Sequence, residues 1–201
     1  MAFITHLSKS SKTLLLFLGL ALLLVLPQRA AAESIHPTRA VARLESDGRL
    51  SVSSRFHTEL PKPLQQVLKQ GVPLHFTLNY RLSAPTWAAY KFKLGQLVGS
   101  DDSVPYKLSF HPLTNRYRVT VGTFSSEYSS LDTALRGVGA IANWAVLPKG
   151  TLEGSEAREV KAEIRLALST DQLPKPFQIN SLTAKHWHLD SGWRPLAVSK
   201  G

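Results

Sequence analysis

Apolar and polar residues alternate without a break from residue 72 to residue 82. Successive side chains of a β-strand point to opposite faces, so this pattern predicts a strand with one buried and one solvated face. The apolar positions are Val72, Leu74, Phe76, Leu78, Tyr80 and Leu82. A helix with a 3.6-residue period would place these residues all around its circumference, so the segment constrains the fold to a β-rich one.

The same alternation recurs at residues 104–111, 116–121 and 160–168, and more weakly at residues 50–56. Asp47-Gly48 precedes the last of these segments and is a typical hairpin turn, and residues 112–115 form a second turn. Strands with one polar face are typical of antiparallel sheets, because parallel sheets are usually covered on both faces. Residues 147–159 are rich in glycine and charge and predict a surface loop or hairpin tip.

Two short helices are expected between the strands. The first follows Pro61 and carries Leu64, Val67 and Leu68 on one face, with Gly71 at its C-terminal cap. The second is capped by Ser130 and covers residues 131–138. Each helix follows a hairpin-like pair of strands and precedes another strand. The fold class we predict is β-rich (α+β), a single antiparallel sandwich-like domain with two short helices.

The first 32 residues have the features of a secretory signal peptide. Lys9 and Lys12 precede an uninterrupted apolar run from Leu14 to Leu26, and Ala30, Ala31 and Ala32 provide a small-residue cleavage site. A membrane anchor is the alternative, but the apolar run is shorter than the roughly 20 residues that span a bilayer. We expect cleavage after about Ala32, a domain at residues 33–201 without a membrane span, and a periplasmic or otherwise exported location.

Composition excludes several classes of site. The chain of 201 residues has no cysteine, which excludes disulfides, thiolate metal sites, cysteine nucleophiles and a lipid-modified cysteine. Its net charge is +10; residues 1–32 hold three basic and no acidic residues, so residues 33–201 retain 21 basic against 14 acidic residues, or +7. A basic protein can bind nucleic acid, but an exported one would not meet it, so we expect no nucleic-acid partner.

No catalytic motif is complete. The nucleophile elbow, zincin and P-loop patterns are absent from the sequence. His186 and His188 lie two apart, on one face if the segment is a strand, and Asp190 could complete a metal site. The alternative is a solvent-facing strand around a buried Trp187. Asp101-Asp102 follow Gly99-Ser100 and fit a turn better than a catalytic pair, and Ser181 and Lys185 lack the spacing of a serine–lysine dyad. We expect no cofactor.

The polar positions of the predicted strands are mostly basic, and Glu163 is the only acid among them. If these strands are neighbours, their outer face is cationic and suits phosphate or carboxylate groups. The alternative is that these side chains only solvate the sheet and protect its edges from aggregation. The binding residues we predict are Arg81, Lys107, Arg116, Arg118, Lys161 and Arg165, with His111 beside them. Of the four tryptophans, Trp87 and Trp144 are assigned to the core, and Trp187 and Trp193 to the core or its border. The alternative is that a tryptophan exposed beside Arg194 anchors a partner or a sugar.

Several short motifs occur in an order that resembles one protein family. They are Leu60-Pro61-Lys62-Pro63, Gly71-Val72-Pro73-Leu74-His75-Phe76, Asn115-Arg116-Tyr117-Arg118-Val119, Leu131-Asp132-Thr133-Ala134-Leu135, Leu173-Pro174, Trp187 and Gly192-Trp193. The chain from residue 33 onward resembles domain-of-unknown-function family 4390, exported proteins of proteobacteria. The resemblance implies an envelope location and a gene near a sensor kinase of the nitrogen-regulation type. It implies no catalytic residues.

The function we predict is a non-catalytic binding or accessory module. Its basic sheet face would meet an anionic envelope component or an envelope protein, in connection with a membrane sensor-kinase system. The alternative is a metal-assisted envelope enzyme around His186 and His188. The sequence does not indicate an oligomeric state.

Overall fold

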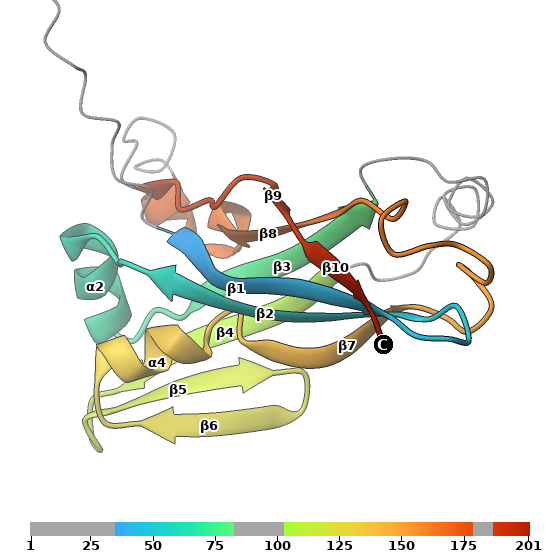
Figure 1. Ribbon diagram of the computed structural model, residues 1–201. Coiled ribbons are helices and arrows are strands. Elements are labelled where there is room, and N and C mark those ends of the chain that lie inside the picture. The colour runs from blue at the N-terminus through green and yellow to red at the C-terminus, as the bar shows by residue number, and fades with distance from the viewer. Residues whose placement is uncertain (1–34, 83–102, 179–186) are drawn as a thin grey trace, which may run out of the picture. The chain divides into compact units, whose positions relative to one another are not determined.

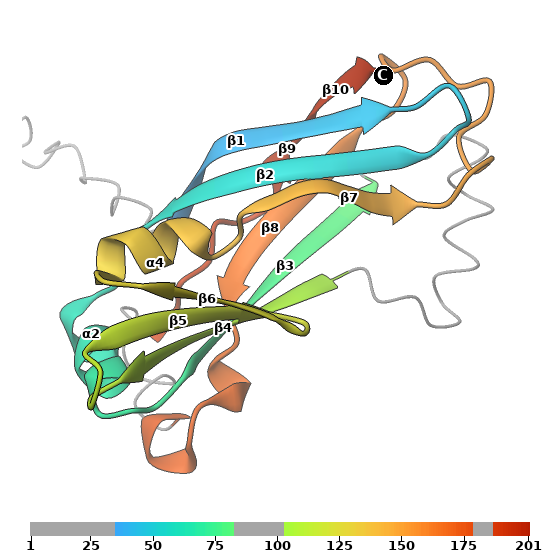
Figure 2. The same cartoon turned by 90° about the horizontal axis from the view of Figure 1, so that it is seen from below.

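The computed structural model describes residues 35–82, 103–178 and 187–201, all of which belong to one unit, residues 33–201. Ten strands form a four-stranded sheet, in the order β10-β1-β2-β7, and a six-stranded sheet, in the order β6-β5-β4-β3-β8-β9. The pairing is antiparallel except between β1 and β10, and Figures 1 and 2 show the two sheets as separate layers. The predicted β-rich, sandwich-like fold is confirmed.

The four-stranded sheet contains β1 (Ile35–Leu44), β2 (Leu50–Thr58), β7 (Ile141–Leu147) and β10 (Ala197–Lys200). The six-stranded sheet contains β3 (Leu74–Leu82), β4 (Ser103–His111), β5 (Arg116–Val121), β6 (Phe124–Tyr128), β8 (Ala162–Leu168) and β9 (Arg194–Pro195). The helices are α2 (Lys62–Lys69), α4 (Leu131–Gly137) and the 3-10 turn η1 (Thr170–Gln172). The sequence predicted two helices, and η1 is the third.

Each α-helix carries the chain from one sheet to the other. The hairpin β1–β2 is followed by α2 and then by β3 of the opposite sheet, and the hairpin β5–β6 is followed by α4 and then by β7. Both helices lie at the end of the sandwich where β2 ends (Figure 1). The loop predicted at residues 147–159 is confirmed. It is not a hairpin tip, because it connects β7 of one sheet to β8 of the other, and its Leu152 is buried.

The core lies between the sheets and is continuous. Phe56 of β2 and Phe76 of β3 are buried within it, and the apolar face of α2 is buried with them. Hydrogen bonds also join the two sheets: the Tyr80 hydroxyl of β3 donates to the Val146 carbonyl of β7 at 2.9 Å, and the Tyr106 hydroxyl of β4 donates to the Ala140 carbonyl, just before β7, at 3.1 Å. The inward faces of the predicted strands are therefore joined by burial and by directed hydrogen bonds.

Two expected strand boundaries move for a local reason. Val72 lies outside β3 because its N–H donates to the Val67 carbonyl, while Gly71 donates to Leu68. Together with Gly71 at φ +88°, these bonds form a Schellman motif that ends α2. Val160 similarly donates to Ala157 in a turn before β8. Ser130 caps α4 as predicted, since its Oγ accepts the Thr133 N–H at 3.3 Å.

No helix in the described part of the chain is long and apolar enough to cross a membrane.

Candidate functional site

The six basic residues predicted to bind a partner all occupy positions that alternate with buried residues of the six-stranded sheet. Arg81, Lys107, Arg116 and Lys161 are exposed, while Arg118 and Arg165 are partly covered. Their neighbours along the strands, including Tyr106, Leu108 and Val119, belong to the core. This alternation places the basic residues on the outer face of the sheet.

Three of these six cations have an acidic partner. Arg81 lies directly opposite Glu163, and its Nε is 2.8 Å from Glu163 Oε2. Arg118 lies directly opposite Glu127, with Nη2 2.6 Å from Glu127 Oε1. The hydrogen bond from Arg118 lowers the pKa of Glu127 below its ordinary value. Glu163 is thus not the only acid on this face, because Glu127 comes from β6, a strand that the sequence pattern did not predict.

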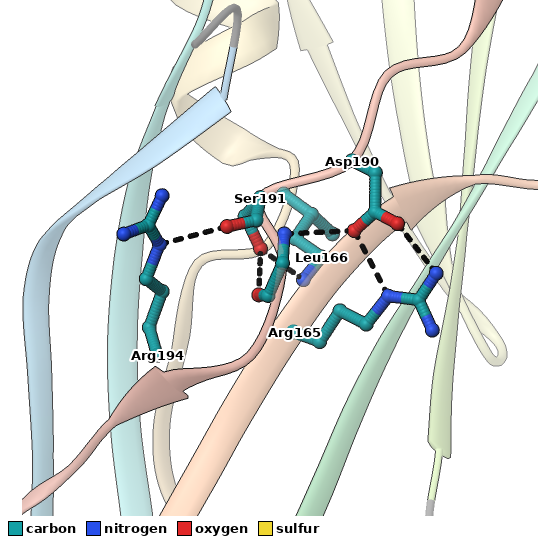
Figure 3. Close-up of polar contacts among 6 residues, drawn as sticks. Arg165, Leu166, Asp190, Ser191 and Arg194 are labelled. Carbon is teal, nitrogen blue, oxygen red and sulfur yellow. Dashed lines mark hydrogen bonds and ion pairs between the residues drawn. The ribbon is translucent and has the colours of Figure 1, made fainter.

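Arg165 is neutralised by a segment far away in the sequence. Its Nε donates to Asp190 Oδ1 at 2.9 Å and its Nη2 to Asp190 Oδ2 at 2.5 Å. These hydrogen bonds lower the pKa of Asp190, and they outweigh the opposing effect of its partial burial. The Gly192 N–H also donates to Asp190 Oδ1, at 2.9 Å, so the carboxylate is held from two sides (Figure 3).

Ser191 fastens this segment to β8. Its N–H donates to the Leu166 carbonyl at 3.0 Å, and its Oγ accepts the Leu166 N–H at 2.9 Å (Figure 3). The same hydroxyl donates to the Gly192 carbonyl, and Arg194 Nε donates to the Ser191 carbonyl at 2.7 Å. Ser191 is buried. We call residues 190–194 the C-terminal clamp, since one serine satisfies both backbone groups of Leu166 and brings Asp190 to Arg165.

Trp193 of the clamp is partly buried and lies on the outer face, outside the core, which agrees with the alternative position beside Arg194 better than with a place in the core. The guanidinium carbon of Arg81 is 4.2 Å from the centre of the Trp193 ring, and that of Arg165 is 5.9 Å away. Both distances fit cation–π contacts. Trp187 is buried and stacks on Phe177, and Trp144 packs against the core beside Tyr80, as predicted. Trp87 lies outside the described residues.

The remaining three cations, Lys107, Arg116 and Lys161, take part in none of the ion pairs found among the described residues. Lys107 lies opposite His75, and Arg116 lies opposite His111. Partial burial lowers the pKa of His75, and the nearby charge of Lys107 lowers it further. Lys107 and Arg116 therefore leave the β4–β5 part of this face cationic.

Of the predicted metal ligands, the structure describes His188 and Asp190 but not His186. His188 is exposed, and Asp190 is occupied by Arg165 and Gly192. His186, Asp101, Asp102, Ser181 and Lys185 lie outside the described residues. Within residues 35–82, 103–178 and 187–201, no three His, Asp or Glu side chains are grouped in a way that could hold a metal ion.

The outer face of the four-stranded sheet carries basic residues that the sequence analysis missed. Arg39 of β1 lies directly opposite Arg55 of β2, and His36 lies directly opposite His57 with ring centroids 4.9 Å apart. All four side chains are exposed. Arg55 and His57 already alternate with buried residues, which was the available signal. The signal in β1 was hidden because Pro37 and a bulge between Pro37 and Arg39 interrupt its alternation.

A cleft of about 540 Å³ adjoins this face where β2, α2 and α4 meet. Its lining includes His57, Glu59, Gln65, Asp132 and Arg136, so it carries charges of both signs. The Thr58 hydroxyl at its border is buried and has no hydrogen-bond partner among the described residues. The lining therefore does not point to a ligand of one charge.

Comparison with known proteins gives one match. Residues 32–197 match the family model described as a domain of unknown function, DUF4390. No match is found among curated proteins or among solved structures. Because the match covers most of the chain, this protein belongs to the DUF4390 family of domains of unknown function.

Proposed function

We propose that the protein is a non-catalytic binding module of the cell envelope, which engages an anionic component or an acidic protein surface through the outer face of its six-stranded sheet. The observation that carries the proposal is the placement of Lys107 and Arg116 on neighbouring strands, where neither takes part in an ion pair among the described residues. Lys161, exposed just before β8, adds a third cation. Unneutralised cations attract anionic partners and speed their association.

An envelope location supports the choice of partner. Lys9 and Lys12, the apolar run from Leu14 to Leu26 and the alanines before Glu33 form a secretory signal. Lipid headgroups and acidic cell-wall polymers are abundant anions outside the cytoplasm. Mass spectrometry of the protein recovered from its native envelope would test this location: the expected product begins at or near Glu33, whereas a product that retains residues 1–32 would contradict the processing we propose.

Binding is tested by reversing the three unpaired cations together, as Lys107→Glu, Arg116→Glu and Lys161→Glu. We expect this variant to elute from an anionic envelope extract at lower salt than the unchanged protein, because Coulombic attraction at an exposed surface is lost and is screened by salt. Arg81 and Arg118 are left unchanged, since a glutamate there would face Glu163 or Glu127 and destabilise the sheet.

The matched control reverses three exposed lysines elsewhere, Lys69→Glu, Lys149→Glu and Lys175→Glu, and so makes the same change in net charge. It should be retained more strongly than the sheet variant. Thermal melting confirms that both variants are folded. Equal retention of the two variants would show that only net charge matters and would overturn the proposal for this face.

A further inference from the structure

Two arginines face each other across the β1–β2 pair without neutralisation. Arg39 and Arg55 are directly opposite in register, which places their Cβ atoms about 5 Å apart. Neither takes part in an ion pair within the described residues. Like charges directly opposite each other destabilise a sheet. No two arginines face each other in the described register of the six-stranded sheet, where Arg81 and Arg118 each face a glutamate and Arg116 faces His111.

Two histidines lie beside this arginine pair on the same face. His36 and His57 form the facing pair on the side where β2 ends, and their rings are tilted by 43°. Thr38 lies at the bulge in β1, between Pro37 and Arg39, and its hydroxyl donates to the Arg55 carbonyl at 3.2 Å. Arg43 adds a third exposed cation further along β1. The nearest described acid at the histidine end is Glu59, whose Oε1 is 3.4 Å from His57 Nε2.

We propose that Arg39 and Arg55, assisted by His36 and His57, form a binding site for a phosphoryl group on the outer face of the four-stranded sheet. A single guanidinium can satisfy both oxygens of a carboxylate, whereas a terminal phosphoryl group offers three oxygens and carries up to two negative charges. Two opposed guanidinium groups match that charge and number of acceptors, and each imidazole adds a ring N–H donor. The phosphoryl group can be free or part of a lipid headgroup.

This site is separate from the surface in the proposed function, since it lies on the other sheet and uses none of the same residues. The two proposals can therefore fail independently. Reversing Lys107, Arg116 and Lys161 should leave phosphoryl binding at Arg39 and Arg55 unchanged.

The decisive variant is Arg55→Glu, which converts the Arg39–Arg55 pair into an opposite-charge pair like Arg81–Glu163. We expect binding of inorganic pyrophosphate to weaken at least about tenfold, as for the loss of one charge-assisted contact. We also expect the melting temperature to rise, because a repulsive cross-strand pair becomes attractive. A variant that is more stable and yet binds less tightly cannot be explained by unfolding. Arg39→Gln provides a second variant that removes one cation without adding an acid.

Two probes distinguish free from lipid-bound phosphoryl groups. Pyrophosphate is titrated into the purified protein while the arginine Nε–Hε signals are followed by NMR, and co-sedimentation is measured with vesicles of phosphatidylglycerol in phosphatidylcholine. Saturable shifts at Arg39 and Arg55 support a free ligand. Vesicle binding that is lost in Arg55→Glu, without pyrophosphate shifts, supports a headgroup.

Acetate and Arg158→Glu are the controls. Acetate tests whether any carboxylate suffices, and Arg158→Glu makes the same change in net charge at an exposed loop position. The proposal is overturned if Arg55→Glu weakens neither probe more than Arg158→Glu does, or if acetate shifts the Arg39 and Arg55 signals as strongly as pyrophosphate.

Discussion

The outer faces of the two sheets differ in what lies opposite their arginines. On the six-stranded sheet, Arg81 and Arg118 each face a glutamate across the strand pair, and Arg165 is held by Asp190 of the C-terminal clamp. On the four-stranded sheet, Arg39 faces Arg55. The difference shows that the number of surface cations does not tell how many of them are neutralised. Strand register decides this, because it places an acid or another cation opposite each arginine.

The largest effect is expected from loosening the clamp that neutralises Arg165. Ser191→Ala leaves the buried Leu166 N–H without its acceptor, and an unsatisfied buried donor costs about 1–3 kcal/mol. Urea unfolding should therefore show a clear loss of free energy of unfolding. Ser199→Ala, at an exposed position of β10, is the matched control and should change stability little. Equal stabilities of the two variants would show that the Ser191 hydroxyl does not hold the clamp.

A smaller effect is expected when the paired face is made to resemble the unpaired one. Glu163→Arg removes the ion pair with Arg81 and creates two facing cations, with a cost of about 1 kcal/mol. Exchanging the charges, as Arg81→Glu with Glu163→Arg, should restore most of the stability but not the contact of Arg81 with Trp193. The register argument fails if Glu163→Arg is no less stable than Glu163→Gln in thermal unfolding.

The smallest effect is expected from acid. The folded protein lowers the pKa of Asp190, mainly through the hydrogen bonds from Arg165. Its contribution to stability is therefore complete above the ordinary carboxyl pKa of about 3.9 and is lost as the pH falls through the lower, folded-state value. The stability difference between the unchanged protein and Asp190→Asn should shrink from neutral pH to about pH 3.

Arg165→Gln removes the other partner of the same ion pair and should show the same pH dependence as Asp190→Asn. Both measurements use urea midpoints at several pH values. A constant difference across this range, for either variant, would indicate that Asp190 does not contribute through its ionised form.

The strands with regular alternation and the capped helices could be predicted from local residues. The burial of β3 follows from its period of two, and the ends of α2 and α4 follow from Gly71 and Ser130. The predictions missed β1, β6 and β7, where bulges or mostly exposed residues remove the periodic signal. A bulge shifts the phase of alternation by one residue, so the period-two pattern that predicts a strand is interrupted there.

For the candidate sites, the sequence predicted which side chains face outward but not which charges they pair with. Alternation correctly indicated which basic residues of the six-stranded sheet point away from the core, because this depends on neighbouring residues alone. Their neutralisation by Glu127 and Asp190 depends on which segments pair. The place of Trp193 depends on tertiary structure in the same way, because the clamp positions its ring beside Arg81 on the outer face.

The sequence by itself determined the absence of sulfur chemistry from residues 33–201, because the chain contains no cysteine and its single methionine is Met1. It also determined which strand positions are apolar, and thus the β-rich fold class. Tertiary structure decided which charges meet. Hydrophobic periodicity is a local property of the chain, whereas the pairing of Arg81 with Glu163 and of Arg39 with Arg55 arises only when strand register is established.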